Sequence, residues 1–389
     1  MKINTRKPSH WFLLAQQGLF TLIAIVNRNL SRKQPTPMVV LYGHQLSGNL
    51  KALYDFWSRS QDQSFEMAFL SLDPEQAAAL EASGINVLRC DSLTDMLVVG
   101  SARAIITDHG LHAMTPLLKW TDIFFIDVWH GIPFKGFVAE DFKLQHQYDE
   151  VWVSSPLLKQ IYSERFGFEP ERVISMGYAR TDKLFQPDDS GLHFRQTMGI
   201  TEQEKVVLYA PTWQQDHSGR DLFPFGESAE SFINELVGVC KKNGARLVIR
   251  SHLNAEIDTD ITDRAIFCSQ KEYADTEAIL LATDVLVCDW SSIAFDFLPL
   301  QRPTLFLDVP APFRNGFTLG PEYRFGFICP DLHKLGEAIS SALSDGEQFL
   351  APYQNFMQTT ITDAYGDHTS GTSSKEQFGR LEKLFTHRA

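Results

Sequence analysis

Short apolar runs rich in β-branched residues alternate with helical patterns along most of this chain, and this alternation limits the fold more than any other feature. Such runs are too short for helices and are typical of strands buried on both faces of a sheet. Strands interleaved with helices predict βαβ units and a parallel sheet. A first series of strands is expected at Met38–Gly43, Glu66–Ser71, Asn86–Arg89, Arg103–Thr107, Ile123–Val128, Glu150–Val153 and Val173–Met176.

The same α/β pattern is repeated in the second half of the chain. Pro187–Gly191 has the composition of a linker, and 389 residues are enough for two domains. We expect an N-terminal helix over 1–34, doubly wound domains over 35–190 and 191–350, and helices over 351–389 that pack back across the domains. Ligands should bind beyond the carboxyl ends of the strands, in a cleft between the domains. The second series of strands is expected at Lys205–Tyr209, Arg246–Arg250, Ala265–Cys268, Val285–Cys288 and Thr304–Leu307.

The segment Trp11–Val26 is mostly apolar and has basic residues on both sides. It is shorter than the roughly 20 apolar residues of a spanning helix, and Gln16, Gln17 and Gly18 interrupt it. No small-x-small cleavage site follows, so a signal peptide is not expected. An amphipathic helix on a membrane surface fits this pattern, with packing on its own domain or a partner subunit, or true spanning, as alternatives. One stripe of the helical wheel is polar: His10, Gln17, Thr21 and Arg28.

Composition excludes several classes of protein. The net charge of −13 argues against a general nucleic-acid-binding protein but allows a local basic pocket for one phosphorylated ligand. No Cys or His spacing predicts a zinc site, and reduced core thiols in a cytosolic protein are expected. The five cysteines are scattered: Cys90, Cys240, Cys268, Cys288 and Cys329.

The stretch Val285–Phe297 combines a buried strand with the start of a helix. Ser291 and Ser292 stand at that start, where free backbone N–H groups and the helix dipole favour an anion. Asp296 lies one turn beyond Ser292 and is placed to accept from a ribose hydroxyl. The alternative is an ordinary serine N-cap on a buried helix.

Polar groups follow four other predicted strands, and this shared placement is the main functional signal. His130 has the residue type of a general base near neutral pH, with a hydrogen-bonded structural histidine as the alternative. His109 and His112 form another polar loop, which we interpret as structural or acceptor-side. The four stretches are Gly43–Tyr54, Trp129–Lys135, Ala210–Trp213 and Arg250–His252.

The other candidates have equally plain alternatives. His252 with Arg250 can bind phosphate oxygens, or the two form a surface pair at a strand end. Thr212 and Trp213 offer a hydroxyl and an aromatic face to a nucleotide, although Trp213 can also serve interdomain packing. Lys135 is either an anion contact or a solvated side chain.

Taken together, these stretches resemble the motifs of the CDP-glycerol glycerophosphotransferases, which build teichoic acids and some capsule polymers. The sequence HGIPFK at 130–135 is similar to HGTPLK of that family, and APTW at 210–213 matches its APTW. DWSS at 289–292, followed by FDF, resembles DYSS and FDY, and SGNLKALY at 47–54 resembles SDNPKALY. The motifs occur in the family's order.

The resemblance implies a GT-B type fold and transfer of glycerol phosphate from CDP-glycerol to an acceptor hydroxyl, with release of CMP. His130 would deprotonate the acceptor hydroxyl, in an acceptor that is lipid-linked or a growing polymer. His252 would be the second catalytic residue and would hold the donor pyrophosphate together with Ser291 and Ser292. The donor-binding residues would be Thr212, Trp213, Arg250, Ser291, Ser292 and Asp296, with Asp296 near the ribose. The acceptor side would include Ser47, Asn49 and Lys135.

The chain departs from the family's motifs at Ile132, Phe134, Trp290 and Leu253, which we expect to affect the donor and acceptor pockets. The polyol therefore stays open between glycerol, ribitol and another CDP-linked unit. No DxD-type pair follows a strand of the predicted cleft, so no dedicated metal site is expected, although a divalent cation can enter bound to the donor pyrophosphate.

Two other functions fit the same pattern. One is a GT-B glycosyltransferase or sugar-nucleotide epimerase, and the other is a capsule-assembly binding protein that has lost the chemistry. The expected location is the cytoplasmic face of the plasma membrane, as a peripheral protein.

Overall fold

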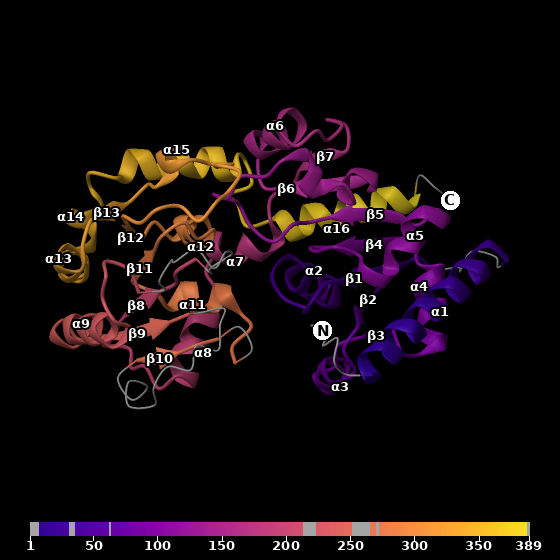
Figure 1. Cartoon of the computed structure of the whole chain (residues 1–389), viewed down its shortest axis with the longest axis horizontal. Helices are drawn as coiled ribbons and strands as arrows, with labels where there is room; N and C mark the ends of the chain where they lie inside the picture. Colours follow the sequence, from indigo (N-terminus) through magenta and orange to yellow (C-terminus); the bar gives the residue numbers. More distant parts are fainter. Residues whose placement is uncertain are drawn as a thin grey trace. The chain divides into compact units, whose positions relative to one another are not determined.

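The computed structural model describes residues 8–30, 36–61, 64–212, 223–250, 265–269 and 272–386, which form two compact units (Figure 1). The boundary after Arg180 lies before the predicted linker, and α8 (Ser190–Thr197) begins inside that linker. The C-terminal segment is shared between the units instead of forming a part of its own. Unit 1 comprises Met1–His130, Ala139–Arg180 and Thr372–Ala389, and unit 2 comprises Gly131–Val138 and Thr181–Gly371.

The sheet of unit 1 has the order β3-β2-β1-β4-β5-β6-β7, and all neighbouring strands are parallel. In β1, Val39 and Leu41 belong to one buried cluster and Val40 and Tyr42 to another, so both faces are covered. The strands are β1 (Met38–Tyr42), β2 (Glu66–Ser71), β3 (Val87–Arg89), β4 (Ala104–Thr107), β5 (Phe124–Asp127), β6 (Glu150–Val153) and β7 (Val173–Ser175).

Helices cover both faces of this sheet. α2 and α16 contribute to one buried cluster, whereas α1 and α4 contribute to the other (Figure 1). The helices are α1 (Pro8–Leu30), α2 (Gly48–Arg59), α3 (Pro74–Ala82), α4 (Leu93–Ser101), α5 (Thr115–Trp120), α6 (Pro156–Glu164) and α16 (Ser373–Thr386). Short 3₁₀ helices occur at His112–Met114, Ala139–Phe142, Gln145–Gln147 and, at the boundary, Ala179–Thr181.

Unit 2 repeats this design with a parallel sheet in the order β10-β9-β8-β11-β12-β13. The described strands are β8 (Lys205–Tyr209), β9 (Ala245–Ile249), β10 (Ile266–Phe267), β11 (Val285–Cys288), β12 (Thr304–Leu307) and β13 (Phe327–Cys329). The described helices are α7 (Asp182–Phe185), α8, α9 (Ala229–Lys242), α11 (Thr276–Ala282), α12 (Ile293–Phe297), α13 (Leu332–Ser344), α14 (Gly346–Leu350) and α15 (Gln354–Tyr365), with 3₁₀ helices at Leu298–Leu300 and Pro321–Tyr323.

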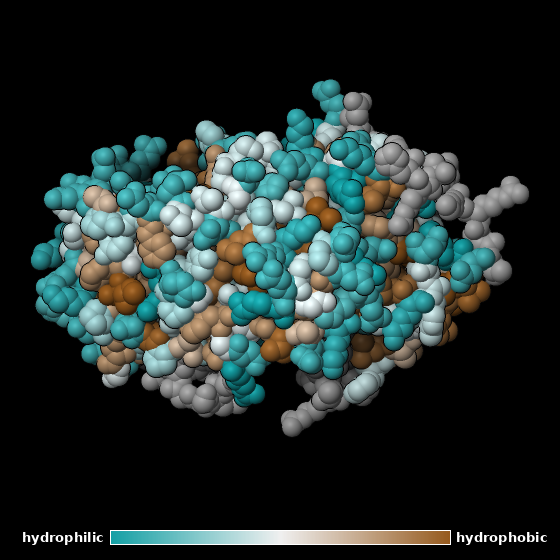
Figure 2. Space-filling view, turned by 90° about the horizontal axis from the view of Figure 1, so that it is seen from above, coloured by the Kyte–Doolittle hydropathy of each residue, from teal (hydrophilic) through white to brown (hydrophobic). Residues whose placement is uncertain are grey.

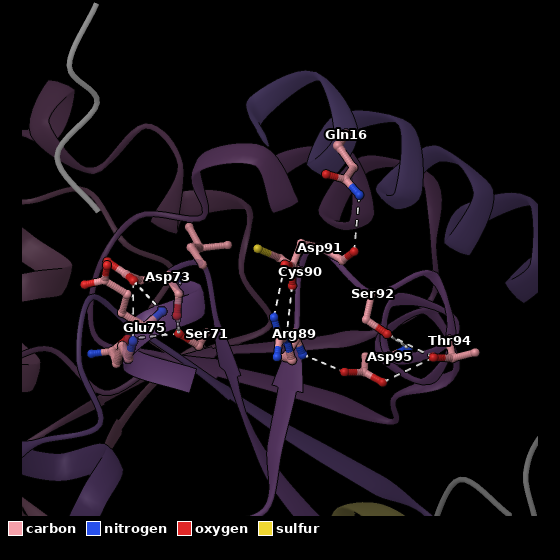
Figure 3. Close-up of polar contacts among 12 residues, drawn as sticks. Gln16, Ser71, Asp73, Glu75, Arg89, Cys90, Asp91, Ser92, Thr94 and Asp95 are labelled. Atoms are coloured by element: carbon pink, nitrogen blue, oxygen red, sulfur yellow. Dashed lines mark hydrogen bonds and ion pairs between the residues drawn. The ribbon is translucent and has the colours of Figure 1, made fainter. Parts of the chain in front are cut away.

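The helix α1 packs on unit 1 through its polar stripe. Gln16 donates to the Asp91 carbonyl at 3.3 Å, as Figure 3 shows, and Gln17 donates to the Cys90 sulfur at 2.9 Å. A Cβ at Gly100 of α4 would lie 2.6 Å from the Ala24 carbonyl, so α1 and α4 approach closely. Both amides therefore find partners inside unit 1, which agrees with the alternative that this helix packs on its own domain.

The opposite side of α1 is apolar and exposed. Phe12 is 72% exposed, and no described helix of the chain is long and apolar enough to cross a membrane. Elsewhere the surface is different: on the face shown in Figure 2, hydrophilic residues predominate and hydrophobic ones occur in small groups. The exposed apolar stripe of α1 consists of Trp11, Phe12, Leu19, Leu22 and Val26.

A buried ion pair ties α16 to the sheet of unit 1. The Glu150 carboxylate is almost fully buried, accepts from Trp152 Nε1 at 2.8 Å, and pairs with the Arg380 guanidinium. Because removal of the cation leaves a buried carboxylate, Arg380→Ala is expected to lower the free energy of unfolding by about 2–3 kcal/mol in urea titrations. As a control, Asp122→Ala breaks the Arg28 ion pair at an exposed carboxylate and should cost below about 1 kcal/mol. Equal losses in both variants would contradict this assignment.

Candidate active site

Four histidines gather at the carboxyl edge of the sheet of unit 1. β1, β4 and β5 are neighbours in the sheet, so the turns that follow them lie side by side. His44 follows β1, His109 and His112 follow β4, and His130 follows β5. We call these four residues the histidine cluster.

The rings of the histidine cluster are in contact. The ring centroids of His109 and His130 are 4.7 Å apart with an interplanar angle of 8°, which is a stacked arrangement. His44 lies 4.7 Å from His109 and 5.1 Å from His112. The Tyr42 hydroxyl lies 3.0 Å from His112 Nδ1. The sequence suggested no partner for His109 and His112, because only the sheet order reveals these neighbours.

The hydrogen bond of His130 fixes which nitrogen is available. Its Nδ1 lies 3.0 Å from the Asp108 carbonyl, which can only accept, so Nδ1 carries the proton. Nε2 of the neutral ring then keeps its lone pair. The residue remains accessible to solvent, yet the protein packed around it and, next, the charge of His109 lower the pKa of His130 to about 4. At neutral pH the ring is therefore an unprotonated base.

Asp108 connects two of the imidazoles. Its carbonyl holds His130, and its carboxylate oxygen Oδ1 lies 2.7 Å from His109 Nδ1. Burial lowers the pKa of His109, but the hydrogen bond and charge of Asp108 outweigh this effect, and the pKa is raised overall. A Cβ at Gly43 would lie 2.5 Å from Asp108 Oδ1, so only glycine leaves room for this carboxylate.

The loop that carries His130 is held in an uncommon conformation. Trp129 has a φ of 44°, in the left-handed region, and its indole stacks on His130 at 4.5 Å. Asn49 secures the loop because its Nδ2 donates to the Val128 and Trp129 carbonyls at 3.0 Å each, while its Oδ1 accepts from Arg180 N. Asn49 is buried, and these contacts point to a positioning role in place of the expected acceptor contact.

Asp127 lies beneath this loop as a buried acid. Its Oδ1 accepts from Trp129 N at 2.8 Å, whereas its buried Oδ2 has no hydrogen-bond partner among the described residues. Burial, opposed by the hydrogen bond from Trp129, raises the pKa of Asp127 to about 7. The acid is therefore largely neutral below pH 7.

This burial predicts a pH dependence of stability. Because the pKa of Asp127 is raised in the folded state, its contribution is complete below about pH 4 and is lost as the pH rises through about 7. Asp127→Asn keeps an acceptor for Trp129 and cannot ionise. We expect the variant to gain stability over the wild type as the pH rises from 5 to 8, measured by urea unfolding. A constant difference between the two proteins across this range would contradict the prediction.

The other two acceptor-side candidates, Ser47 and Lys135, lie in different local environments. Ser47 is the N-cap of α2, and its hydroxyl makes no cap hydrogen bond. Lys135 belongs to unit 2, where it forms a β-bridge with Phe317 and its ammonium lies 5.1 Å from the Phe137 ring centroid. The departures Ile132 and Phe134 are buried, so they contribute to packing instead of lining a pocket.

In unit 2, Asp289 joins the loops that follow β8 and β11. Its Oδ1 accepts from Thr212 N at 2.8 Å, from Trp290 N at 2.6 Å, and from the Thr212 hydroxyl. The carboxylate is buried, and it fixes the backbone that leads into Ser291 and Ser292. Both serines are partly exposed beyond the end of β11, as the sequence predicted.

Trp290 is held in a fixed position by a residue that sequence reasoning missed. Its Nε1 donates to the Val309 carbonyl at 2.8 Å, and the Arg324 guanidinium lies 4.4 Å from the ring centroid. Arg324 precedes β13 and follows no polar motif, so no local signal identifies it. Phe134 packs on the same indole.

The remaining donor candidates are either buried or lie outside the described residues. Arg250 is buried and donates to the Tyr273 carbonyl at 3.0 Å and the Thr276 hydroxyl at 2.8 Å. The Asp296 carboxylate is also buried, which does not favour the expected ribose contact. His252 and Trp213 lie outside the described residues. Among the described residues, no group of three or more His, Cys, Asp or Glu side chains forms a metal site.

Two doubly wound parallel sheets of this type define a GT-B-like transferase fold. A model of the CDP-glycerol:poly(glycerophosphate) glycerophosphotransferase family matches residues 23–362. The chain belongs to this family, which confirms the resemblance of its motifs.

Known proteins agree with this assignment. The chain is 25% identical over 358 residues to the teichoic acid poly(glycerol phosphate) polymerase of Bacillus spizizenii, covering 86% of this chain and 88% of the relative. The wall teichoic acid polymerase TagF has the same fold, with a TM-score of 0.74 at 19% identity over 97% of this chain and 94% of that chain. The UDP-GlcNAc 2-epimerase of Neisseria meningitidis gives 0.57 at 14% identity, over 90% and 100% of the two chains.

Proposed function

We propose that this protein transfers glycerol phosphate, or a related polyol phosphate, from a CDP-linked donor to an acceptor hydroxyl in the synthesis of a teichoic acid-like or capsular polymer. The observation that carries the proposal is the arrangement of His130, whose Nε2 lone pair is kept available by the bond from Nδ1 to the Asp108 carbonyl. Family membership supports the donor, and the neutral imidazole supports the base.

In the proposed reaction, the acceptor hydroxyl transfers its proton to His130 Nε2 as its oxygen attacks the phosphorus that carries the polyol. The new P–O bond forms as the bond to the bridging oxygen of the diphosphate breaks. CMP leaves with that electron pair. Positioning and charge neutralisation supply most of the catalysis in such transfers.

The proposal assigns the donor to unit 2. Ser291 and Ser292 offer hydroxyl groups to the diphosphate, on a backbone that Asp289 holds in place. Thr212 supports the site through its bond to Asp289. His252, Trp213, Arg250 and Asp296 stay predicted donor residues, and Ser47 and Lys135 predicted acceptor-side residues.

Radiolabelled donors test the proposal. CDP-glycerol and CDP-ribitol, each with a lipid-linked acceptor, should show which polyol is incorporated, with one CMP released for each unit transferred. Turnover of UDP-sugars in place of both CDP-polyols would favour the alternative glycosyltransferase or epimerase. Binding without CMP release would favour the assembly protein. Parallel rates with EDTA and with Mg²⁺ test whether a divalent cation enters with the donor pyrophosphate.

We also propose that α1 places the protein on the cytoplasmic face of the plasma membrane. Its exposed stripe is apolar, and the polar side chains of its inner side bond to groups of unit 1. Arg32 and Lys33 follow the helix in the sequence, and such basic residues favour anionic lipids. Phe12→Glu with Leu19→Glu should abolish co-sedimentation with phosphatidylglycerol vesicles. Leu192→Glu, which alters an exposed apolar side chain of unit 2, should retain it. Unchanged vesicle binding of the double variant would contradict this proposal. A smaller oligomer for the double variant than for the wild type would instead favour a partner subunit on this stripe.

A further inference from the structure

His109 is a titratable side chain that the proposed reaction does not use, yet its ring lies flat on the base. The two centroids are 4.7 Å apart and the planes differ by 8°. The indole of Trp129 stacks on His130 at 4.5 Å. His130 thus stacks on an indole and on a second imidazole, and a charge on that imidazole acts directly on the pKa of His130.

We propose that His109, anchored by Asp108, is a positioning residue that stays protonated and sets the neighbouring His130 as a neutral base. The inference rests on the proposed role of His130 and adds a residue that acts through it. Asp108 contacts both rings, because its carboxylate accepts a hydrogen bond from His109 Nδ1 and its carbonyl accepts one from His130 Nδ1. One residue therefore orients both imidazoles.

The pKa shifts within the histidine cluster distinguish His109 from the other three rings. Burial works against a charge on His109, but the hydrogen bond and the charge of Asp108 raise its pKa overall. Burial and the charge of His109 lower the pKa of His44 and of His130. Burial also lowers the pKa of His112, to which the charge of His109 contributes. Among the four rings, His109 is thus the one whose pKa is raised, so its surroundings favour a positive charge there.

Titratable and charged groups on several described elements face the two rings. His130 faces His109 and Asp108 after β4, and Arg180, whose charge also lowers its pKa. His109 faces Asp108, Asp127 at the end of β5, and His44 after β1. Asp108 favours the charge on His109, whereas burial and the charge of His109 lower the pKa of His130 by more than Asp108 raises it.

A fixed positive charge against the base has two consequences. It keeps His130 unprotonated at mildly acidic pH, so that the lone pair is available in nearly every molecule. It also makes the protonated His130 that transfer creates a stronger acid, which returns its proton to solvent before the next turnover. Both effects require a charge at His109, not merely a ring.

The test is the titration of His130 in full-length protein with labelled histidine, followed by NMR through the ring C2–H. His109→Gln removes the charge, and we expect the His130 titration to rise by about one pH unit. The acid limb of the pH profile of CMP release should shift to higher pH by the same amount. The rate at pH 5, relative to the rate at pH 8, should therefore fall about two-fold. His109→Lys restores a charge and should return the titration toward the wild-type value.

His112→Gln is the matched control, because His112 belongs to the same cluster but does not stack on His130. It should leave the His130 titration unchanged. A His130 titration that does not move in His109→Gln would overturn the inference, whatever the rates. A titration that moves while the acid limb of the rate stays in place would support the charge arrangement and contradict the base role of His130, so the two proposals fail separately.

Discussion

Replacing His130 with alanine is expected to slow CMP release by about 10²–10⁴-fold and to leave the donor KM nearly unchanged. The variant lacks the Nε2 lone pair that the bond to the Asp108 carbonyl keeps available. It loses no donor contact that the proposal assigns. Single-turnover rates with radiolabelled CDP-glycerol measure the effect, and added imidazole should restore part of the activity.

The pH profile gives an independent view of the same residue. A base works only when unprotonated, so the wild-type rate should fall as the pH drops through the pKa of His130, about 4. His112→Ala removes an exposed imidazole from the same sheet edge and should change the rate by less than about three-fold. Wild-type turnover in His130→Ala would refute the base assignment.

Replacing Asp289 with alanine should produce the second large effect, this time on stability. Three donors lose their acceptor: Thr212 N, the Thr212 hydroxyl and Trp290 N. Since hydrogen bonds to a buried carboxylate are among the stronger ones, we expect the free energy of unfolding to fall by about 3–5 kcal/mol, measured in urea.

The donor KM should rise as well, because the backbone that leads into Ser291 and Ser292 would lose its support. Asp289→Asn is the matched control: it keeps the accepting oxygen, and the stability loss should be about 1 kcal/mol or less. Equal losses in the two variants would show that charge, and not the acceptor position, is what unit 2 requires at residue 289.

Much of the fold follows from the pattern of apolar runs. Glu66–Ser71 and Lys205–Tyr209 were predicted to the residue, because strands buried on both faces leave a continuous apolar signal. The edge strand β13 (Phe327–Cys329) escaped prediction, since it has three residues and Ile328 is exposed. For helix α1 the sequence left open whether it lies on a membrane or packs on its own domain, because the carbonyl and sulfur partners of Gln16 and Gln17 lie far away in sequence.

The candidate site likewise contains residues that the sequence predicts and residues that only the sheet order reveals. His130, Ser291 and Ser292 could be predicted because each follows a recognisable strand. His109 could not be assigned a role, since its contact with His130 depends on β4 and β5 being neighbours in the sheet. The resemblance placed Asn49 on the acceptor side, whereas its role in holding the loop at Trp129 depends on contacts that the sequence does not reveal.

The stacking of His130 between Trp129 and His109 also bears on the entropy of the reaction. A free imidazole samples several rotamers and has to be immobilised in the transition state. Here two rings stack on the imidazole and one nitrogen is anchored, so folding has already restricted that motion. The direction of the lone pair is set before any acceptor arrives, and substrate binding energy need not be used to aim it.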